Sequence, residues 1–377
     1  MKMSLADLAL PLIRYLDPER AHRIAIGALK LGLGPNVRAT PDPILATNIF
    51  GMDFSNPIGL AAGFDKSVEA IGPLLQLGAG FIEVGTLTPR AQTGNPKPRV
   101  FRLTEDQAAI NRYGFNNDGL DIGLVRLAEQ SRSAGIVGIN VGINKDSDDQ
   151  VSDFATATRQ ATPFADYLTV NVSSPNTLGL RDLQDADQLD YLLDAVVTAR
   201  ADVTGTAKVP PLFLKIAPDV DRSTVERIVR TAINRAADGL VVANTTIGRP
   251  NTLKSPYRGE AGGLSGRPVF ALSTKVLAWA YLCADGELPV VGVGGVDDAD
   301  TAYAKIRAGA SLVQLYTGLI YKGPGLFRSI AVGLAERLRR DKLTNVADAI
   351  GLDAEIWAEN TINWHHGKGD SECIVSY

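Results

Sequence analysis

Eight short apolar runs recur between residues 58 and 316, and each is followed by a longer segment in which apolar residues repeat at helical spacing. Turn residues bound the runs, which are apolar throughout rather than alternating, as is typical of strands buried on both faces of a parallel sheet. The sequence predicts strands at Ile58–Ala62, Phe81–Val84, Ile136–Val141, Tyr167–Val172, Leu212–Ile216, Leu240–Ala243, Val290–Val293 and Leu312–Tyr316.

Eight strand–helix units favour an α/β protein with a (β/α)8 TIM barrel, which we place at residues 41–340. A doubly wound sheet fits less well, because no GxGxxG motif follows an early strand. In such barrels the active site lies at the carboxyl ends of the strands.

Residues 1–40 are predicted to form a small amphipathic helical extension. Leu5, Leu8, Leu12 and Leu16 belong to a first apolar stripe, and a second helix begins with Asp17 as N-cap and ends near Gly32 or Gly34. This segment holds six basic and three acidic residues, a net charge of +3. The helical pair either packs on the barrel or lies on a membrane surface.

Residues 341–377 form a C-terminal extension to which the sequence assigns no role. Trp357 and Trp364 could belong to a strap over the barrel, or the segment could be a mobile tail. The adjacent His365 and His366 are interpreted as surface residues rather than a metal site.

Charge and composition exclude several classes of protein. The net charge of −4 argues against nucleic acid as the main partner, and no apolar stretch is long enough to span a membrane. Two cysteines, Cys283 and Cys373, and three histidines predict neither a disulfide framework nor a metal site. A reducing compartment is expected, either in the cytosol or on the cytosolic side of a membrane.

The residues that follow the predicted strands are amides, hydroxyls, glycines and lysines, with no histidine and no carboxylate pair. Paired-acid glycosidase chemistry is therefore disfavoured, and the composition suits a planar polar ligand. The segments are AAGFDK (61–66), GTLTP (85–89), NVGINKD (140–146), NVSSPNTLGLR (171–181), LKIAPD (214–219), NTTIGR (244–249), GVGGV (292–296) and LYTG (315–318).

Three of these features suggest particular chemistry. The glycines of GVGGV allow the backbone to approach a phosphate closely. Lys66 and Lys215 could reach solvent, form a Schiff base, or hold an anionic ligand. Ser174 lies in a turn-rich loop without a nearby histidine, so proton transfer suits it better than nucleophilic attack.

Taken together, the motifs resemble those of class 2, quinone-dependent dihydroorotate dehydrogenases. The resemblance runs from about residue 15 to 335, through DPERAH, GLAAGFDK, PRVFRL, NRYGFNN, GIN, NVSSPNT, KIAPD, NTT, GGLSGRP, GVGGV and YTG in the same order. It implies oxidation of (S)-dihydroorotate to orotate in de novo pyrimidine (UMP) synthesis, with FMN as hydride acceptor and ubiquinone as final electron acceptor.

The resemblance also assigns residues. It makes Ser174 the catalytic base, beneath a lid formed by residues 171–181, and lets Lys215 stabilise the charge of the reduced flavin. It implies substrate contacts from Lys66, Asn111, Arg112, Tyr113, Gly114, Phe115, Asn171, Asn176, Asn244 and Thr245. It implies FMN contacts from Ala62, Gly63, Lys66, Thr86, Asn140, Asn171, Lys215, Gly266, Gly295, Tyr316 and Thr317.

In this class the N-terminal helices form the mouth of a quinone tunnel, so the resemblance implies quinone contacts from His22, Arg102 and Tyr316. It favours the membrane interpretation of residues 1–40, with peripheral contact to lipid on the cytoplasmic side of the cell membrane. No nucleic acid and no obligatory protein partner is expected. Ile143 departs from the family pattern, since many relatives carry a basic residue there.

Other functions remain open at the level of sequence. A class 1 enzyme would carry a cysteine at position 174 and lack the amphipathic extension, and a tRNA-uridine reductase would require a basic face. A Schiff-base lyase using Lys215 and an inactive lipid-binding module are alternatives from other classes, and a colourless protein would favour either.

Overall fold

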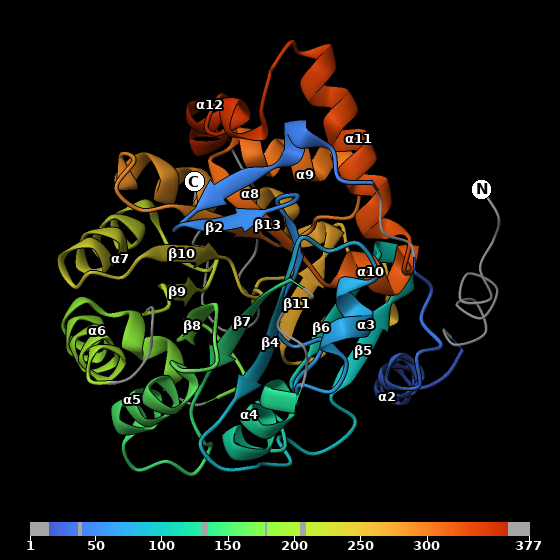
Figure 1. The fold of residues 1–377 in the computed structure, drawn as a ribbon. Helices are drawn as coiled ribbons and strands as arrows, with labels where there is room; N and C mark the ends of the chain where they lie inside the picture. Colours follow the sequence, from blue (N-terminus) through green and yellow to red (C-terminus); the bar gives the residue numbers. More distant parts are fainter. Residues whose placement is uncertain (1–14, 37–39, 130–134, 178, 204–208, 361–377) are drawn as a thin grey trace.

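A computed structural model describes residues 15–36, 40–129, 135–177, 179–203 and 209–360. Eight strands, each hydrogen-bonded in parallel to its neighbours, form a closed barrel, which confirms the predicted fold (Figure 1). In chain order they are β3 (Ile58–Leu60), β4 (Phe81–Leu87), β7 (Ile136–Val141), β8 (Tyr167–Asn171), β9 (Leu212–Ile216), β10 (Gly239–Val242), β12 (Val290–Val293) and β13 (Ala310–Leu315). Each predicted strand therefore has its counterpart, displaced by at most three residues at an end.

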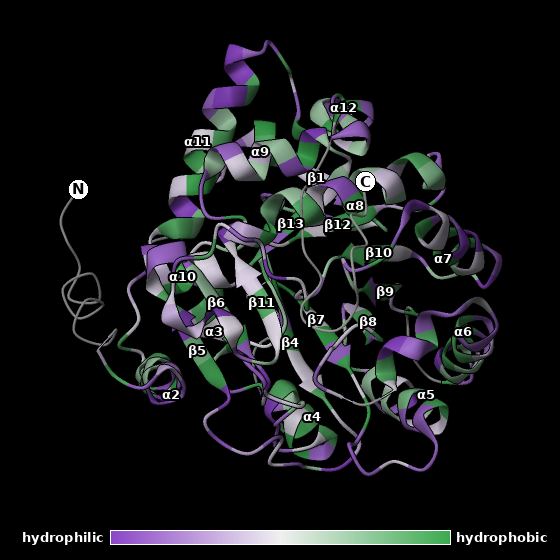
Figure 2. Ribbon diagram, turned by 180° about the vertical axis from the view of Figure 1, so that it is seen from behind, coloured by the Kyte–Doolittle hydropathy of each residue, from purple (hydrophilic) through white to green (hydrophobic). Residues whose placement is uncertain are grey.

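Helices surround the strands and bury their apolar stripes against them, whereas polar residues face outward (Figure 2). In α7, for example, Val225, Ile228, Val229 and Ala232 are buried. The helices around the barrel are α3 (Ile71–Leu75), α4 (Leu120–Glu129), α5 (Gln150–Ala161), α6 (Ala186–Ala201), α7 (Arg222–Asn234), α8 (Phe270–Ala284), α9 (Ala299–Arg307), α10 (Thr317–Lys322) and α11 (Leu326–Arg340). Short 3-10 helices are η1 (Pro43–Leu45), η2 (Thr104–Asp106), η4 (Leu180–Gln184), η5 (Pro256–Gly259), η6 (Arg267–Val269) and η7 (Val346–Ala349).

A hairpin closes the amino end of the barrel, in a region that the sequence pattern presents only as a connection. It consists of β1 (Thr47–Ile49) and β2 (Met52–Phe54), which pair antiparallel. Phe54 is buried and packs edge-on against Phe81, at 5.4 Å between ring centroids. The hairpin thus excludes water from the end of the barrel opposite the strand carboxyl ends.

A second addition lies at the carboxyl end, where β5 (Val100–Leu103), β6 (Ala108–Asn111) and β11 (Gly263–Gly266) form an antiparallel sheet. The sequence pattern does not reveal these four-residue strands, because each contains a polar residue (VFRL, AAIN and GLSG) and none forms a continuous apolar run. They extend the barrel wall on one side of its opening.

Helix α2 (Pro18–Lys30) confirms the predicted second N-terminal helix. The carboxylate of Asp17 accepts from the backbone N of Arg20 at 2.9 Å, and Pro18 occupies the first helical position. The helix contacts β5 and α3 and lies at the periphery of the molecule, outside the ring of helices (Figure 1). The helix predicted from Leu5, Leu8, Leu12 and Leu16 lies mostly outside the described residues.

The described part of the C-terminal extension packs on the outside of the barrel. Helix α12 (Ala354–Glu359) lies on α8, where the indole N–H of Trp279 donates to the carbonyl of Ala358 at 3.0 Å. Trp357 meets Phe270 edge-on at 5.7 Å, and Arg307 forms a bidentate ion pair with Asp353. Trp364, His365, His366 and Cys373 lie outside the described residues.

Candidate active site

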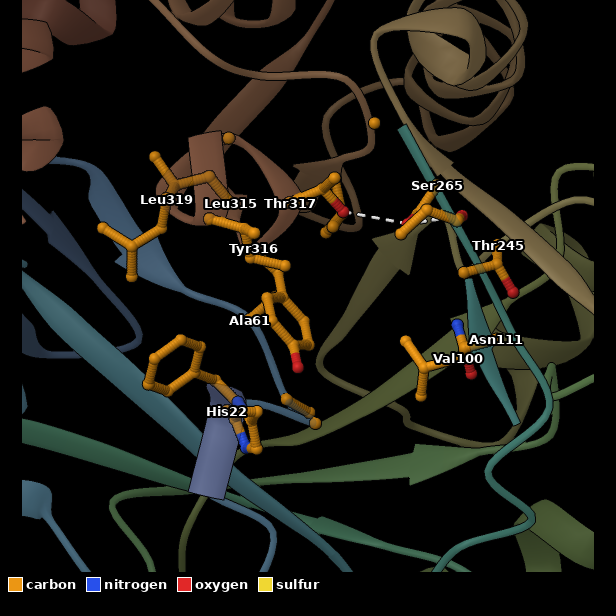
Figure 3. Close-up of a pocket in the computed structure, with 18 of the residues that line it drawn as sticks. His22, Ala61, Val100, Asn111, Thr245, Ser265, Leu315, Tyr316, Thr317 and Leu319 are labelled. Carbon is orange, nitrogen blue, oxygen red and sulfur yellow. Dashed lines mark hydrogen bonds between the residues drawn. The ribbon is translucent and has the colours of Figure 1, made fainter. Parts of the chain in front are cut away.

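A cavity of about 640 Å³ opens at the carboxyl ends of the barrel strands. The barrel rim forms its floor, while the β5–β6–β11 sheet and α2 form its walls (Figure 3). The volume lies within the range of small-molecule and cofactor sites.

Nearly all the residues assigned from sequence meet in this one cavity. Its lining includes Ser174, Lys66, Asn111, Tyr113, Gly114, Phe115, Asn171, Asn176, Asn244, Thr245, Ala62, Gly63, Thr86, Lys215, Gly266, Gly295, Tyr316, Thr317, His22 and Arg102. Two assigned residues are not in the lining. Arg112 is paired with Glu260 at 2.9 Å and stacked on Phe101, and Asn140 is fully buried beneath Thr86 and Asn171.

Asparagine side chains form a hydrogen-bonded row along the cavity floor. The amide N of Asn171 donates to the hydroxyl of Thr86 and to Oδ1 of Asn140, each at 3.2 Å. Its Oδ1 accepts from the Ser173 hydroxyl at 2.8 Å and from the Asn244 amide at 3.2 Å. The row therefore offers a ligand donors and acceptors in a fixed arrangement.

The loop that carries Ser174 is held over the cavity by groups from other segments. Arg181 donates to the carbonyl oxygens of Ser173 and Thr245 and pairs with Asp219 at 2.7 Å. Ser174 is buried, and its hydroxyl accepts from the backbone N of Asn176 at 3.3 Å. The described part of this loop thus places a water-shielded hydroxyl at the cavity.

Two lysines reach the cavity from different sides. Lys66 lies with its ammonium 4.3 Å from the centre of the Tyr113 ring, and burial lowers the pKa of Lys66 to about 8 against the opposing fields of Glu19 and Asp65. Burial also lowers the pKa of Lys215, whereas the carboxylate of Glu83 opposes that shift. Within the described part of the chain, the Lys215 amine has no hydrogen-bond acceptor.

A glycine turn after β12 closes one end of the cavity. Gly294 and Gly295 both adopt positive φ, and a Cβ atom on Gly295 would lie 2.6 Å from Cα of Phe270. The hydroxyl of Ser273 donates to the Gly294 carbonyl at 3.2 Å and accepts from the buried amine of Lys305 at 2.7 Å. The turn is therefore fixed from behind, with its backbone facing the cavity.

The acidic residue beside this turn is neutralised. Asp297 is buried, and its carboxylate pairs with Arg267 at 2.5 Å and with Lys322 at 3.5 Å. An anion at the glycine turn would therefore not meet an unbalanced negative charge.

The opposite end of the cavity is apolar and lies against α2. The His22 ring packs edge-on against Phe64 at 5.1 Å, and Tyr316 lies beside both rings (Figure 3). Burial and the charge of Lys66 hold the pKa of His22 well below its usual value. Arg102 closes this end and donates to the carbonyl of Leu16 at 3.5 Å.

A buried ion pair fastens α2 to the cavity wall. Arg99 donates through Nε and Nη2 to the carboxylate of Glu19, at 3.1 and 2.7 Å, and through Nη1 to the carbonyls of Thr93 and Asn95. Burial opposes the charge of Glu19, but Arg99 and Lys97 hold the pKa of this carboxyl below its usual value. The position of α2 is thereby linked to the segment that supports Tyr113.

Several residues that line the cavity were not assigned from the sequence. Asn116 lines the cavity, and its buried Oδ1 has no partner among the described residues. Ser265 lines it too and accepts from the Thr317 hydroxyl at 2.9 Å. Both lie inside the NRYGFNN and GGLSGRP motifs. The motifs therefore identify the segments, whereas the positions of the two side chains follow only from the structure.

The described residues contain no cluster suited to a metal ion and no helix long and apolar enough to span a membrane.

The fold and cavity define a TIM-barrel protein with a site for a planar polar ligand at the strand carboxyl ends and an apolar passage beneath an N-terminal helix. Residues 44–338 match the family model for dihydroorotate dehydrogenase. The chain belongs to the dihydroorotate dehydrogenase family, which oxidises dihydroorotate in pyrimidine biosynthesis.

Curated relatives and solved structures agree with this assignment. Proteins named dihydroorotate dehydrogenase (quinone) from Rhodopseudomonas palustris and Bradyrhizobium diazoefficiens are each 52% identical, over 92% of this chain and 95% of theirs. A crystal structure of DHODH from Eimeria tenella in complex with ferulenol is 41% identical, with a TM-score of 0.86 over 89% of this chain and 96% of that one. The ligand-free structure from the same organism is 42% identical, also with a TM-score of 0.86, over 89% of this chain and 99% of that one.

The glycine turn allows a matched test of packing. Gly295→Ala combines a positive φ with a clash against Phe270, whereas Gly286 has a similar φ and nothing near its Cβ position. We expect Gly286→Ala to cost about 1–2 kcal/mol of unfolding free energy for the backbone alone. Gly295→Ala should cost about 1–3 kcal/mol more from overpacking. Urea unfolding followed by circular dichroism measures both, and equal losses would contradict the described packing.

Proposed function

We propose that this chain oxidises (S)-dihydroorotate to orotate with FMN as hydride acceptor and ubiquinone as the final electron acceptor. The observation that carries this proposal is the convergence of a buried serine, an asparagine row and two lysines in one cavity that continues to α2. Family membership and the names of the quinone-dependent relatives support the same reaction.

Three features of the cavity fit FMN. The glycine turn at 294–295 leaves its backbone open to a phosphate, and the amides and hydroxyls of Asn171 and Thr86 match the polar edge of a flavin ring. The amine of Lys215 reaches the cavity without an acceptor among the described residues and would meet a negative charge there. Bound FMN would supply hydride acceptance and electron transfer to the quinone.

The residues of the chain provide the rest of the chemistry. Lys66 would hold the substrate carboxylate, and the amides of Asn111, Asn176 and Asn244 would pair with the pyrimidine edges. The Ser174 hydroxyl would remove the proton from carbon. Because a serine is a weak base in water, its burial under the loop held by Arg181 supports this role.

The apolar end of the cavity would admit the quinone, whose head group would meet His22, Arg102 and Tyr316. On α2 and the turn after it, Ile24, Leu31 and Leu33 are 50%, 76% and 71% exposed, and Leu33 also lines the cavity. The exposed bases Arg20, Arg23 and Lys30 accompany them. This combination supports peripheral attachment to lipid, which we assign to the cytoplasmic side of the cell membrane.

Anaerobic mixing with dihydroorotate tests the proposed reaction. The native protein should purify with flavin, and its absorbance should bleach rapidly on mixing and return when a ubiquinone analogue is added. Ser174→Ala should slow bleaching by about 100-fold or more, because the base is lost. Ser174→Cys should retain part of the rate, since a thiol can also accept a proton.

The matched control is Ser329→Ala, which removes an exposed hydroxyl on α11. It should bleach at the native rate. A native protein without flavin, or one whose flavin stays oxidised, would refute the proposed reaction. Native bleaching by Ser174→Ala would refute only the assignment of the base.

Orotate binding should depend on pH through Lys66. Its pKa of about 8 means that the ammonium is present below that pH and is lost as the pH rises through it. The dissociation constant of orotate should therefore be constant near pH 6–7 and rise by up to about tenfold per pH unit above pH 8. Flavin difference spectra across this range measure it.

Two variants separate Lys66 from other lysines. Lys66→Gln should weaken orotate binding by about 10–100-fold and remove the rise near pH 8, because a charge-assisted hydrogen bond is lost. Lys254→Gln changes an exposed lysine away from the cavity and should keep the native profile. A Lys66→Gln profile that still rises near pH 8 would show that another group controls binding.

Membrane contact can be tested with paired surface variants. Leu31→Asp combined with Leu33→Asp should weaken sedimentation with anionic phosphatidylglycerol/phosphatidylcholine vesicles by about tenfold or more, because apolar burial is lost. The control pair, Leu352→Asp with Ile356→Asp, alters side chains that are 52% and 70% exposed near α12. Equal effects of the two pairs, or no sedimentation of native protein, would contradict attachment through α2.

A further inference from the structure

A carboxylate lies inside the barrel, one layer below the cavity. Glu83, in the middle of β4, has no solvent exposure and is not part of the cavity lining. Its Oε1 accepts from the amide N of Asn140 at 2.7 Å. Its Oε2 accepts from Gln314 at 2.8 Å and from the hydroxyls of Tyr167 and Thr169, each at 3.2 Å.

The chemistry of a carboxylate fixes the orientation of Asn140. The Glu83 carboxylate acts as the acceptor in all four of these hydrogen bonds, so the amide N of Asn140, and not its carbonyl, faces Glu83. The Oδ1 atom of Asn140 is thereby turned the other way. There it accepts from the Thr86 hydroxyl at 2.6 Å and from the Asn171 amide at 3.2 Å.

The same constraint continues to the cavity floor. Because the amide N of Asn171 is directed to Asn140, its Oδ1 faces Ser173 and Asn244 and accepts from both. The Oδ1 of Asn244 then accepts from the backbone N of Thr245 at 2.7 Å. One acceptor-only group therefore sets the direction of three amides in succession.

We infer that Glu83 is a positioning residue that fixes the donor and acceptor pattern of the cavity floor through Asn140, Asn171 and Asn244. Neither Glu83 nor Asn140 lines the cavity, so both act through the side chains above them. This inference rests on the proposed function for the identity of the ligand, FMN. The hydrogen-bond pattern itself is independent of that identity.

Exchange of the two side chains gives a specific test. Asn140→Asp alone places two carboxylates against each other, so one must take up a proton or turn away and the pattern above is disturbed. In the double variant Glu83→Gln/Asn140→Asp, the new Gln amide N can donate to the Asp. Its carbonyl can still accept from Gln314, Tyr167 and Thr169, and the outer Asp oxygen can still accept from Thr86 and Asn171. The hydrogen-bond pattern presented to Thr86 and Asn171 is then the same as in the native protein.

Glu83→Gln alone is expected to have a milder effect. The carbonyl of the new glutamine can still accept from Asn140 if the amide N of this new side chain points toward Gln314. The Oε1 of Gln314 is buried without a partner among the described residues, so this amide can turn over and accept. Asn140 would then keep its native orientation.

The experiment measures the FMN dissociation constant by fluorescence quenching and the melting temperature of each ligand-free protein. We expect Asn140→Asp to weaken FMN binding by about tenfold or more, since a buried hydrogen-bond pattern is disturbed. The exchange variant should return to within about threefold of native affinity, which is a strongly non-additive double-mutant cycle. Glu83→Gln should stay within about threefold of native.

Thr169→Val is the matched control. It removes one neutral donor from Glu83 without reversing any amide, so it should lower the melting temperature while FMN affinity stays within about twofold. An exchange variant that melts cooperatively yet binds FMN no better than Asn140→Asp would overturn the inference. An Asn140→Asp variant that binds FMN with native affinity would also overturn the inference.

Failure of the proposed function would give a different set of results. If the native protein binds no FMN, the proposed cofactor is wrong. The positioning role of Glu83 is then tested by the melting temperatures of the ligand-free proteins. The exchange variant should then melt above Asn140→Asp. A melting temperature at or below that of Asn140→Asp would overturn the role of Glu83.

Discussion

A carboxylate enclosed in a barrel is shielded from bulk solvent, so neighbouring side chains must supply its hydrogen-bond donors. Glu83 meets this requirement with donors from β7, β8 and β13, and it therefore sits where those strands and β4 face one another inside the barrel. Below it, Phe81, Tyr167 and Phe213 fill the barrel with rings. The interior is thus layered, with an apolar base, a polar middle and the ligand cavity above.

The layers depend on one another. The hairpin β1–β2 covers the aromatic base, which keeps water out of the middle layer from below. Without that cover, the hydrogen bonds of Glu83 would compete with water and would orient Asn140 less strongly. A structural element at the far end of the barrel therefore contributes to the arrangement of the cavity floor, although it touches no ligand.

The sequence predicted the barrel and most of the cavity because both follow from local signals. Buried parallel strands read as apolar runs, and barrel closure brings the segments after them to one rim, where the motifs lie. The short strands of the hairpin and of the β5–β6–β11 sheet have no such signal, since polar residues interrupt each of them and they form no apolar run. Their positions depend on tertiary pairing alone.

The residues that lie outside the cavity lining and those not assigned from the sequence have a similar cause. Arg112 shares a motif with cavity residues, but alternation along the chain directs it toward Glu260 instead. Asn140 and Glu83 lie within strands whose two faces are both buried, so the sequence does not reveal which residues point inward. Closure of the barrel decides this, and it places the polar side chains of four strands in contact with one another.

The arrangement of charges at the site follows from the same layering, in which the lysines line the cavity and the carboxylates lie behind it. Lys66 and Lys215 reach the cavity, but the carboxylates whose fields favour their charged forms do not present free oxygens to a ligand. Glu19 is held by Arg99, and Glu83 accepts from four donors. An anionic ligand would therefore meet positive charge directly, while the balancing negative charge stays behind the wall. The carboxylates help to keep the lysines protonated without competing for them, because their own hydrogen bonds are already made.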